Sequence, residues 1–111
     1  MKAVNLDWMH STWEDYESVS GHGVYVIWSD GGHSLVPYAV YVGQGDVADR
    51  IANHVKDPKI RKHTKDGDLL IAWASVPEYY RDGIERYLAD RHSPVEGDRH
   101  PEAQPIRVND Y

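Results

Sequence analysis

Cysteine and phenylalanine are both absent from the 111-residue sequence. Without cysteine, the chain has no disulfide, no thiolate metal site and no cysteine nucleophile. No stretch approaches the roughly 18 apolar residues of a membrane-spanning helix, and the first residues lack the apolar run of a signal peptide. We therefore expect a cytoplasmic protein without a membrane partner.

Positive charge is also scarce, because the formal net charge is -6. Nucleic-acid binding depends on Lys and Arg releasing counterions from phosphates, so this total argues against it. Between residues 50 and 65, however, Asp57 is the single acidic residue among many basic ones. This stretch is either a solvated surface or a nucleic-acid contact. Under the second interpretation the contacts are Lys56, Lys59, Arg61, Lys62 and Lys65.

The length suits one domain, since single domains usually have about 100 to 200 residues. Four Trp and eight Tyr supply bulk for a core even without Phe. The sequence has no internal repeat, no low-complexity tract and no Gly/Ser linker. We expect a single domain over residues 1–111, with its core at about 21–96 and a loop-rich tail at 97–111.

Local patterns predict the elements of this domain. Ser11 and Glu14 form a capping-box pattern that favours a short helix over 11–18. Two runs rich in β-branched and aromatic residues, 23–29 and 38–42, predict antiparallel strands, because a turn signal at 30–32 lies between them.

A helical pattern follows, in which Asp46 is the expected N-cap and Val47, Ile51 and Val55 form a stripe. This helix should end before Pro58. Residues 69–76 are apolar on both faces, which is typical of a central strand. A second helix should run from Pro77 to about His92 and bury Tyr80, Ile84, Tyr87 and Leu88, and residues 105–109 should lie along the body. The predicted class is α/β (α+β), with a three-stranded, mainly antiparallel central sheet flanked by helices.

Two tripeptides on the first two strands suggest a function. Gly23-Val24-Tyr25 and Tyr41-Val42-Gly43 are followed by Arg50 and His54 on the next helix and by Glu85 on the last. Over about residues 21–96, this order resembles the GIY-YIG nuclease family. The resemblance implies a metal-dependent endonuclease that hydrolyses DNA.

The residue types suit this chemistry. Phosphodiester hydrolysis needs a group that takes a proton from the attacking water and positive charge on the phosphate. Arg50 can pair with the phosphate through two hydrogen bonds, and His54 lies one helical turn further on the same face. A single carboxylate at Glu85 suits Mg²⁺ or Mn²⁺, which retain bound water. A tyrosine with a pKa of about 10 is a poor base unless a cation lowers that pKa.

The resemblance also implies individual roles. Tyr25 is the expected general base, Tyr41 its positioning or proton-transfer partner, and Glu85 the sole protein ligand of the metal. Branched or damaged DNA is a candidate substrate, and the choice between DNA and RNA stays open. One active site cuts one strand at a time, so cutting a duplex would require a homodimer, another protein partner or successive nicks.

Two positions depart from the family pattern. Gln44 stands where lysine is frequent, and Glu96 follows Pro94 where an asparagine is expected. Asn109 is a candidate substitute for that asparagine. These departures leave a second interpretation, a degenerate member of the family that binds nucleic acid or a protein without cutting.

Two other patterns compete with the nuclease interpretation. Residues 43–48 fit the G-x-G-x-x-A dinucleotide fingerprint, but Asp46 would repel a pyrophosphate at the helix N-terminus. His92 and His100, with Glu96 and Asp98 between them, suggest a zinc site, although their spacing matches no finger pattern.

Overall fold

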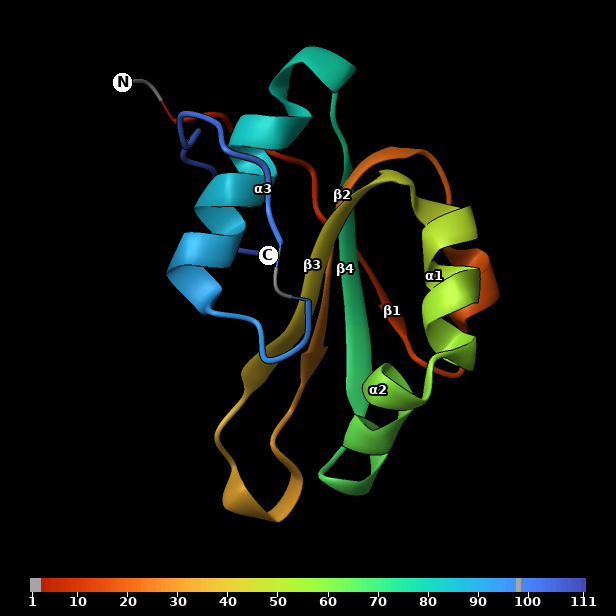
Figure 1. Ribbon diagram of the computed structural model, residues 1–111. Coiled ribbons are helices and arrows are strands. Elements are labelled where there is room, and N and C mark those ends of the chain that lie inside the picture. Colours follow the sequence, from red (N-terminus) through yellow and green to blue (C-terminus); the bar gives the residue numbers. More distant parts are fainter. Residues whose placement is uncertain (1–2, 98) are drawn as a thin grey trace.

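A computed structural model of the chain describes residues 3–97 and 99–111 (Figure 1). Its elements, in chain order, are β1 (Met9–Thr12), the 3-10 turn η1 (Tyr16–Ser18), β2 (His22–Ser29), η2 (Gly32–Ser34), β3 (Tyr38–Asp46), α1 (Val47–Lys56), α2 (Pro58–Arg61), η3 (Lys62–Lys65), β4 (Leu69–Ser75) and α3 (Glu78–His92). None of the helices in the described ranges is long and apolar enough to cross a membrane.

Within these ranges, one antiparallel sheet has four strands in the order β1-β4-β2-β3. The α+β class is therefore confirmed, and β2, β3 and β4 correspond to the three predicted strands. The predicted number of three strands was wrong, because β1 pairs with β4 from Met9 opposite Trp73 to Thr12 opposite Leu70.

The helix predicted over 11–18 was also wrong. The segment forms the end of β1 and the turn η1 instead. The Ser11 hydroxyl donates to the carbonyl of Asp15 (2.9 Å), and the Ser18 hydroxyl donates to the same carbonyl (2.9 Å). Serine hydroxyls that bond nearby backbone groups stabilise turns as readily as helix caps, so this capping pattern is ambiguous in sequence.

Helices cover both faces of the sheet (Figure 1). One face packs against α3 through Ile84 and Leu88, which are both buried. The opposite face packs against α1 and α2 through Val47, Ile51 and Ile60. The central strands β2 and β4 are therefore apolar on both faces, as predicted for 69–76. Tyr80 is 43% exposed, so the prediction that it is buried was wrong.

The predicted N-cap of α1 is confirmed, since the Asp46 side chain accepts a hydrogen bond from the Asp49 amide (3.2 Å). The helix ends at Lys56, before Pro58, as expected. Pro58 then starts α2, which was not predicted, and the Asp57 side chain caps it by accepting from the Lys59 amide (2.9 Å). Proline in the first helical turn costs no hydrogen bond, so Pro58 both ends one helix and begins the next.

The tail lies along the body, as predicted for residues 105–109. The Ile106 amide donates to the Gly83 carbonyl of α3 (2.9 Å), and Val108 forms a parallel bridge with Val4. Earlier in the tail, the amides of Val95 and Glu96 donate to carbonyls of β3. The segment after α3 is therefore attached to the outer edge of the sheet.

The pairing of β2 with β3 contains a bulge. Tyr41 lies opposite Ile27 and Ala39 lies opposite Trp28, so Val40 is an extra residue on β3. Such an insertion changes which residues point to each face. As a result, Tyr38 and Tyr41 contact the same core cluster although they are three residues apart.

Candidate active site

The hydroxyl of Tyr25 is the centre of the candidate site. Tyr25 lies on the central strand β2 and is fully buried. Its hydroxyl lies 2.7 Å from Nε2 of His54 on α1. Gly43 is the direct partner of Tyr25 across the β2–β3 pair, and a Cβ atom at Gly43 would overlap the Tyr25 phenol. Glycine at this position therefore leaves the space through which the phenol reaches α1.

Gly23, the first residue of the other tripeptide, has a different role. A Cβ atom there would overlap the carbonyl of Ala74 on β4. Because glycine has no Cβ atom, β2 and β4 can approach each other at the end of the sheet where Tyr25 lies. Both glycines are thus needed for steric reasons. A side chain at Gly23 would collide with the backbone of β4, and one at Gly43 would collide with the Tyr25 phenol.

Tyr41 completes an aromatic group with Tyr25 and His54. Its ring stacks on Tyr25 with centroids 6.2 Å apart and an interplanar angle of 11°. The centroids of Tyr41 and His54 are 4.3 Å apart. Tyr41 is only half-buried, whereas Tyr25 lies beneath it, so Tyr41 forms the solvent side of the group.

Charge and burial fix the protons in this group. Burial raises the pKa of Tyr25 above its ordinary value, and the Arg50 guanidinium beside its hydroxyl only partly opposes this effect. Burial, aided by the positive charge of Arg50, lowers the pKa of His54 to about 4. At neutral pH, Tyr25 therefore keeps its proton and donates it to the neutral imidazole of His54. The condition noted from the sequence, a cation that lowers the pKa of the tyrosine, is only partly met.

Glu85 comes from α3, which packs on the opposite face of the sheet. Its side chain is 6% exposed, and Oε2 accepts a hydrogen bond from Nδ1 of His100 (3.0 Å). Its negative charge still acts on the aromatic group, since it raises the pKa of both Tyr25 and Arg50. His100 as a partner of Glu85 was missed in the sequence, because the two residues belong to elements without a common local pattern.

The donors near Glu85 limit which metal this region fits. In residues 3–97 and 99–111, no group of three or more His, Asp or Glu residues lies close enough to hold an ion. A site with many protein donors, such as structural zinc, is therefore not supported by the described residues. One carboxylate with water fits Mg²⁺ or Mn²⁺, which need few protein ligands.

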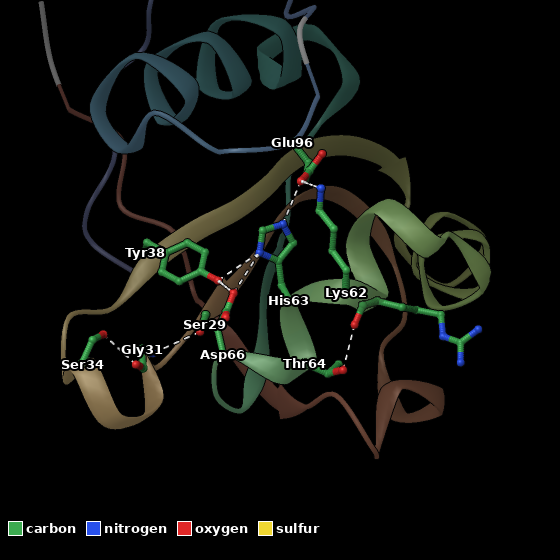
Figure 2. Close-up of polar contacts among 10 residues, drawn as sticks. Ser29, Gly31, Ser34, Tyr38, Lys62, His63, Thr64, Asp66 and Glu96 are labelled. Carbon is green, nitrogen blue, oxygen red and sulfur yellow. Dashed lines mark hydrogen bonds and ion pairs between the residues drawn. The ribbon is translucent and has the colours of Figure 1, made fainter.

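A second polar cluster surrounds Glu96 (Figure 2). Its Oε2 lies 2.7 Å from Nε2 of His63 and 3.2 Å from Nζ of Lys62. His63 in turn meets the Tyr38 hydroxyl through Nδ1 (3.0 Å), and that hydroxyl donates to Asp66 (3.1 Å). Hydrogen bonding from His63, aided by Lys62, lowers the pKa of Glu96, so its carboxylate is ionised. The basic residue Lys62 is thus paired within the protein.

The remaining basic residues predicted to contact nucleic acid are exposed: Lys56, Lys59, Arg61 and Lys65. Gln44 donates to Asp82 (2.8 Å) at the start of α3. Asn109 uses its side chain elsewhere, since it accepts from the amide of Leu6 (2.6 Å) and donates to the carbonyl of the same residue (2.9 Å). Asn109 therefore anchors the two ends of the chain to each other.

The two competing patterns gain no support. Asp46 caps the N-terminus of α1, where a pyrophosphate would bind, and β3 is antiparallel to its neighbour, unlike the strands of a dinucleotide fold. His92, at the end of α3, packs against Tyr111 with ring centroids 5.0 Å apart, whereas His100 in the tail bonds to Glu85. Asp98, the other proposed zinc ligand, lies outside the described residues.

Five side chains from four elements therefore share one electrostatic environment: Tyr25, Tyr41, Arg50, His54 and Glu85. Tyr25 is a proton donor bonded to the neutral imidazole of His54, and Arg50 is a cation near both. Glu85 is a carboxylate whose charge acts on Tyr25 and Arg50. Comparisons with protein-family models, curated proteins and solved structures return no match for this chain.

Proposed function

We propose that this chain is a metal-dependent endonuclease of the GIY-YIG type, which hydrolyses phosphodiester bonds in DNA. The observation that carries the proposal is the buried Tyr25 hydroxyl, bonded at 2.7 Å to the neutral imidazole of His54 beside the Arg50 guanidinium. Phe would fill the same space without a buried polar atom that must be paired, so the hydroxyl and its polar partners indicate a role beyond packing.

Tyr25 and His54 act as a proton relay in this proposal. The attacking water gives its proton to the Tyr25 oxygen while the phenol passes its own proton to Nε2 of His54. The water oxygen forms the new bond to phosphorus, and the bond to the leaving oxygen breaks, so that this oxygen departs with the bonding electrons and takes a proton from solvent. The relay avoids a free tyrosinate, which is costly here because burial raises the pKa of Tyr25.

Arg50 and Tyr41 hold the phosphate. The guanidinium can donate two hydrogen bonds to one phosphate and supplies the positive charge that the transition state needs. Arg50 lies beside the Tyr25 hydroxyl, which accepts the proton of the water, so the bound phosphate and the attacking water lie next to each other. Tyr41, on the solvent side, limits the angle from which the water approaches.

Glu85 is the proposed metal ligand, with Mg²⁺ or Mn²⁺ as the ion. The ion would add positive charge to the phosphate oxygens. Within the chain, the role of Glu85 is to place a carboxylate near Tyr25 and Arg50, on whose pKa values its charge acts. The exposed basic residues Lys56, Lys59, Arg61 and Lys65 would contact the backbone of the substrate.

A cleavage assay tests the proposal. Fluorescent single-stranded, duplex and branched DNA, together with RNA, is incubated with the protein in Mg²⁺, Mn²⁺ or EDTA. We expect cutting that needs the metal and is lost in Glu85→Ala. Glu78→Ala, which removes an exposed carboxylate from the same helix, is the matched control and should retain activity. Undiminished cutting by folded Glu85→Ala would refute the assignment of Glu85.

A second function, binding nucleic acid or a protein partner without cutting, has its own supporting observation. His100 bonds to Glu85, and Glu96 pairs with Lys62 and bonds to His63, so two parts of the proposed nuclease surface are engaged within the chain. Salt-dependent DNA binding by folded protein, with no cleavage under any metal, would favour this function.

A further inference from the structure

A cavity of about 390 Å³ opens next to Tyr41, on the solvent side of the proposed active site. This volume lies within the range of about 300 to 1,000 Å³ that is common for small-ligand pockets. Its walls combine an aromatic ring, two apolar side chains, a lysine and two carboxylates. The lining residues are Tyr41, Asp57, Lys59, Ile60, Val95, Glu96 and Gly97.

Glu96 is held firmly in the wall of this cavity. Its amide donates to the Val40 carbonyl (2.9 Å), which attaches its backbone to the edge of the sheet. Its side chain is held through Oε2 by His63 and Lys62 (Figure 2). A carboxylate with a fixed backbone and two side-chain partners loses little entropy when it binds a ligand.

Gly97 brings this wall against Tyr41. It has a φ of +79°, which favours glycine, and a Cβ atom there would come within 2.8 Å of Cε2 of Tyr41. The close approach places the backbone next to Glu96 against the Cδ2–Cε2 side of the tyrosine ring. A ligand in the cavity therefore meets the Tyr41 ring and the Glu96 carboxylate together.

The fixed negative charge indicates what kind of group binds here. A carboxylate repels phosphate, so the cavity suits a part of a nucleotide that presents N–H donors. A carboxylate has about four acceptor sites, and His63 and Lys62 use two of them on Oε2. No described residue donates a hydrogen bond to Oε1. Two acceptor sites on one oxygen are thus left for a ligand.

Among the bases, guanine matches this pattern. Its Watson–Crick edge has two adjacent donors, N1–H and the N2 amino group, followed by the O6 acceptor. Adenine and cytosine place an acceptor beside their amino group, and thymine and uracil place acceptors on both sides of one N–H. Lys59 supplies a donor for O6, and an aromatic side chain commonly stacks on an unpaired base.

We propose that this cavity binds an unpaired guanine next to the phosphate that is cut, with Glu96 as the specificity-determining residue. The inference rests on the proposed function, because it requires a nucleic acid at the active site. The guanine edge donates N1–H and N2–H to Oε1 of Glu96, and its ring contacts Tyr41. The substrate class is then DNA with an unpaired guanine, in a single strand, a loop or a branch.

Binding measurements in EDTA test the cavity without cleavage. The intact protein is titrated with the 5′-monophosphates of guanosine, inosine, adenosine and cytidine, followed by NMR shifts. Inosine lacks only the N2 amino group, so we expect guanosine to bind roughly tenfold tighter, the effect of one hydrogen bond to a charged acceptor. Glu96→Gln, which keeps the size of the side chain, should remove this preference. Glu17→Gln, an exposed carboxylate in η1, should keep it.

The same comparison is repeated with oligothymidylates that carry one central guanine or one inosine, which bind through their backbone as well. Equal binding of the two bases in both formats, or a guanine preference that persists in Glu96→Gln, would overturn the proposal. Guanine-specific binding with no cleavage keeps the cavity and refutes the nuclease. Cleavage with no guanine preference keeps the nuclease and refutes the guanine-binding cavity.

Discussion

The phenol of Tyr25 occupies the space that a side chain on Gly43 would need. The two residues are direct partners in the β2–β3 pair, so the glycine of the second tripeptide leaves room for the tyrosine of the first. This relationship gives a physical reason why the two tripeptides occur together. It also indicates that the position of Tyr25 is determined by β3 and not only by its own strand.

Substituting Gly43 should therefore displace the phenol. We expect Gly43→Ala to destabilise the fold by about 1 to 3 kcal/mol, the usual cost of overpacking a core, and to abolish cleavage. In a Tyr25→Ala background the same substitution should cost much less, because the clashing ring is gone. Urea unfolding of the four proteins measures this coupling. Equal costs in both backgrounds would show that Gly43 acts in another way.

The chain contains a matched pair of tyrosines for testing the proton relay. Tyr25 bonds to His54 (2.7 Å) and Tyr38 bonds to His63 (3.0 Å), but only Tyr25 stacks on Tyr41 beside Arg50. We expect Tyr25→Phe to lower the cleavage rate by about a hundredfold or more, as loss of a general base does. Tyr38→Phe should change the rate only a few-fold. Similar losses in the two variants would contradict the relay.

His100 should compete with the metal for Glu85. Its Nδ1 donates to Oε2 of Glu85, so an ion that binds this oxygen competes with the imidazole for its electrons and for the space beside it. We expect His100→Ala to bind Mn²⁺ several-fold more tightly in calorimetric titrations, whereas His33→Ala, at an exposed site, should match the unmodified protein. Weaker binding in His100→Ala would mean that the imidazole is itself a ligand of the ion.

The low pKa of His54 predicts a loss of stability in mild acid. Below its ordinary pKa of 6.5, His54 of the unfolded chain takes up a proton that the folded protein accepts only near pH 4. The unfolded state then binds more protons, so the free energy of unfolding falls as the pH drops from about 6.5 to about 4.

Because His54 is partly exposed, we expect its share of this loss to be on the order of 1 kcal/mol. Urea unfolding at pH 7 and pH 5 measures it, and His54→Gln should show a smaller difference between the two pH values. The comparison with the variant is needed because burial also lowers the pKa of His92, which acts in the same direction. An identical pH dependence in His54→Gln would contradict the assignment.

The basic residues should contribute unequally to DNA binding. Replacing Lys56 or Lys59 by Ala should reduce the slope of log affinity against log salt by about one, if each neutralises one phosphate. Lys62→Ala should change the slope less, because its ammonium group already pairs with Glu96. Fluorescence anisotropy at several salt concentrations provides the slopes. A full unit of change in Lys62→Ala would show that DNA displaces Glu96.

Local patterns predicted most of the fold. The apolar runs and the stripe of Val47 and Ile51 placed three strands and the two long helices within a few residues of their observed bounds. β1 was missed because its stability comes from pairing with β4, a contact between distant parts of the chain. A four-residue strand has too few residues for an alternating pattern to be recognised in sequence.

The site was predictable in a similar way. Residues at fixed spacing, such as Arg50 and His54 on one helix face, could be placed together from sequence alone. His63 with Glu96, and His100 with Glu85, could not, because each pair joins the body to a tail without regular structure. The sequence did single out Glu96 as an unexpected charge, but not Lys62 and His63, which hold its carboxylate.

The bulge at Val40 makes the length of β3 as important as its composition. If Val40 paired regularly instead, β3 would alternate strictly, and Tyr38 and Tyr41, which are three residues apart, would point to opposite faces. Two polar sites, one around His54 and one around His63, would then no longer share a surface. A conservative substitution in β3 should thus be tolerated far better than one additional residue between Tyr38 and Tyr41, which would move the two rings to opposite faces.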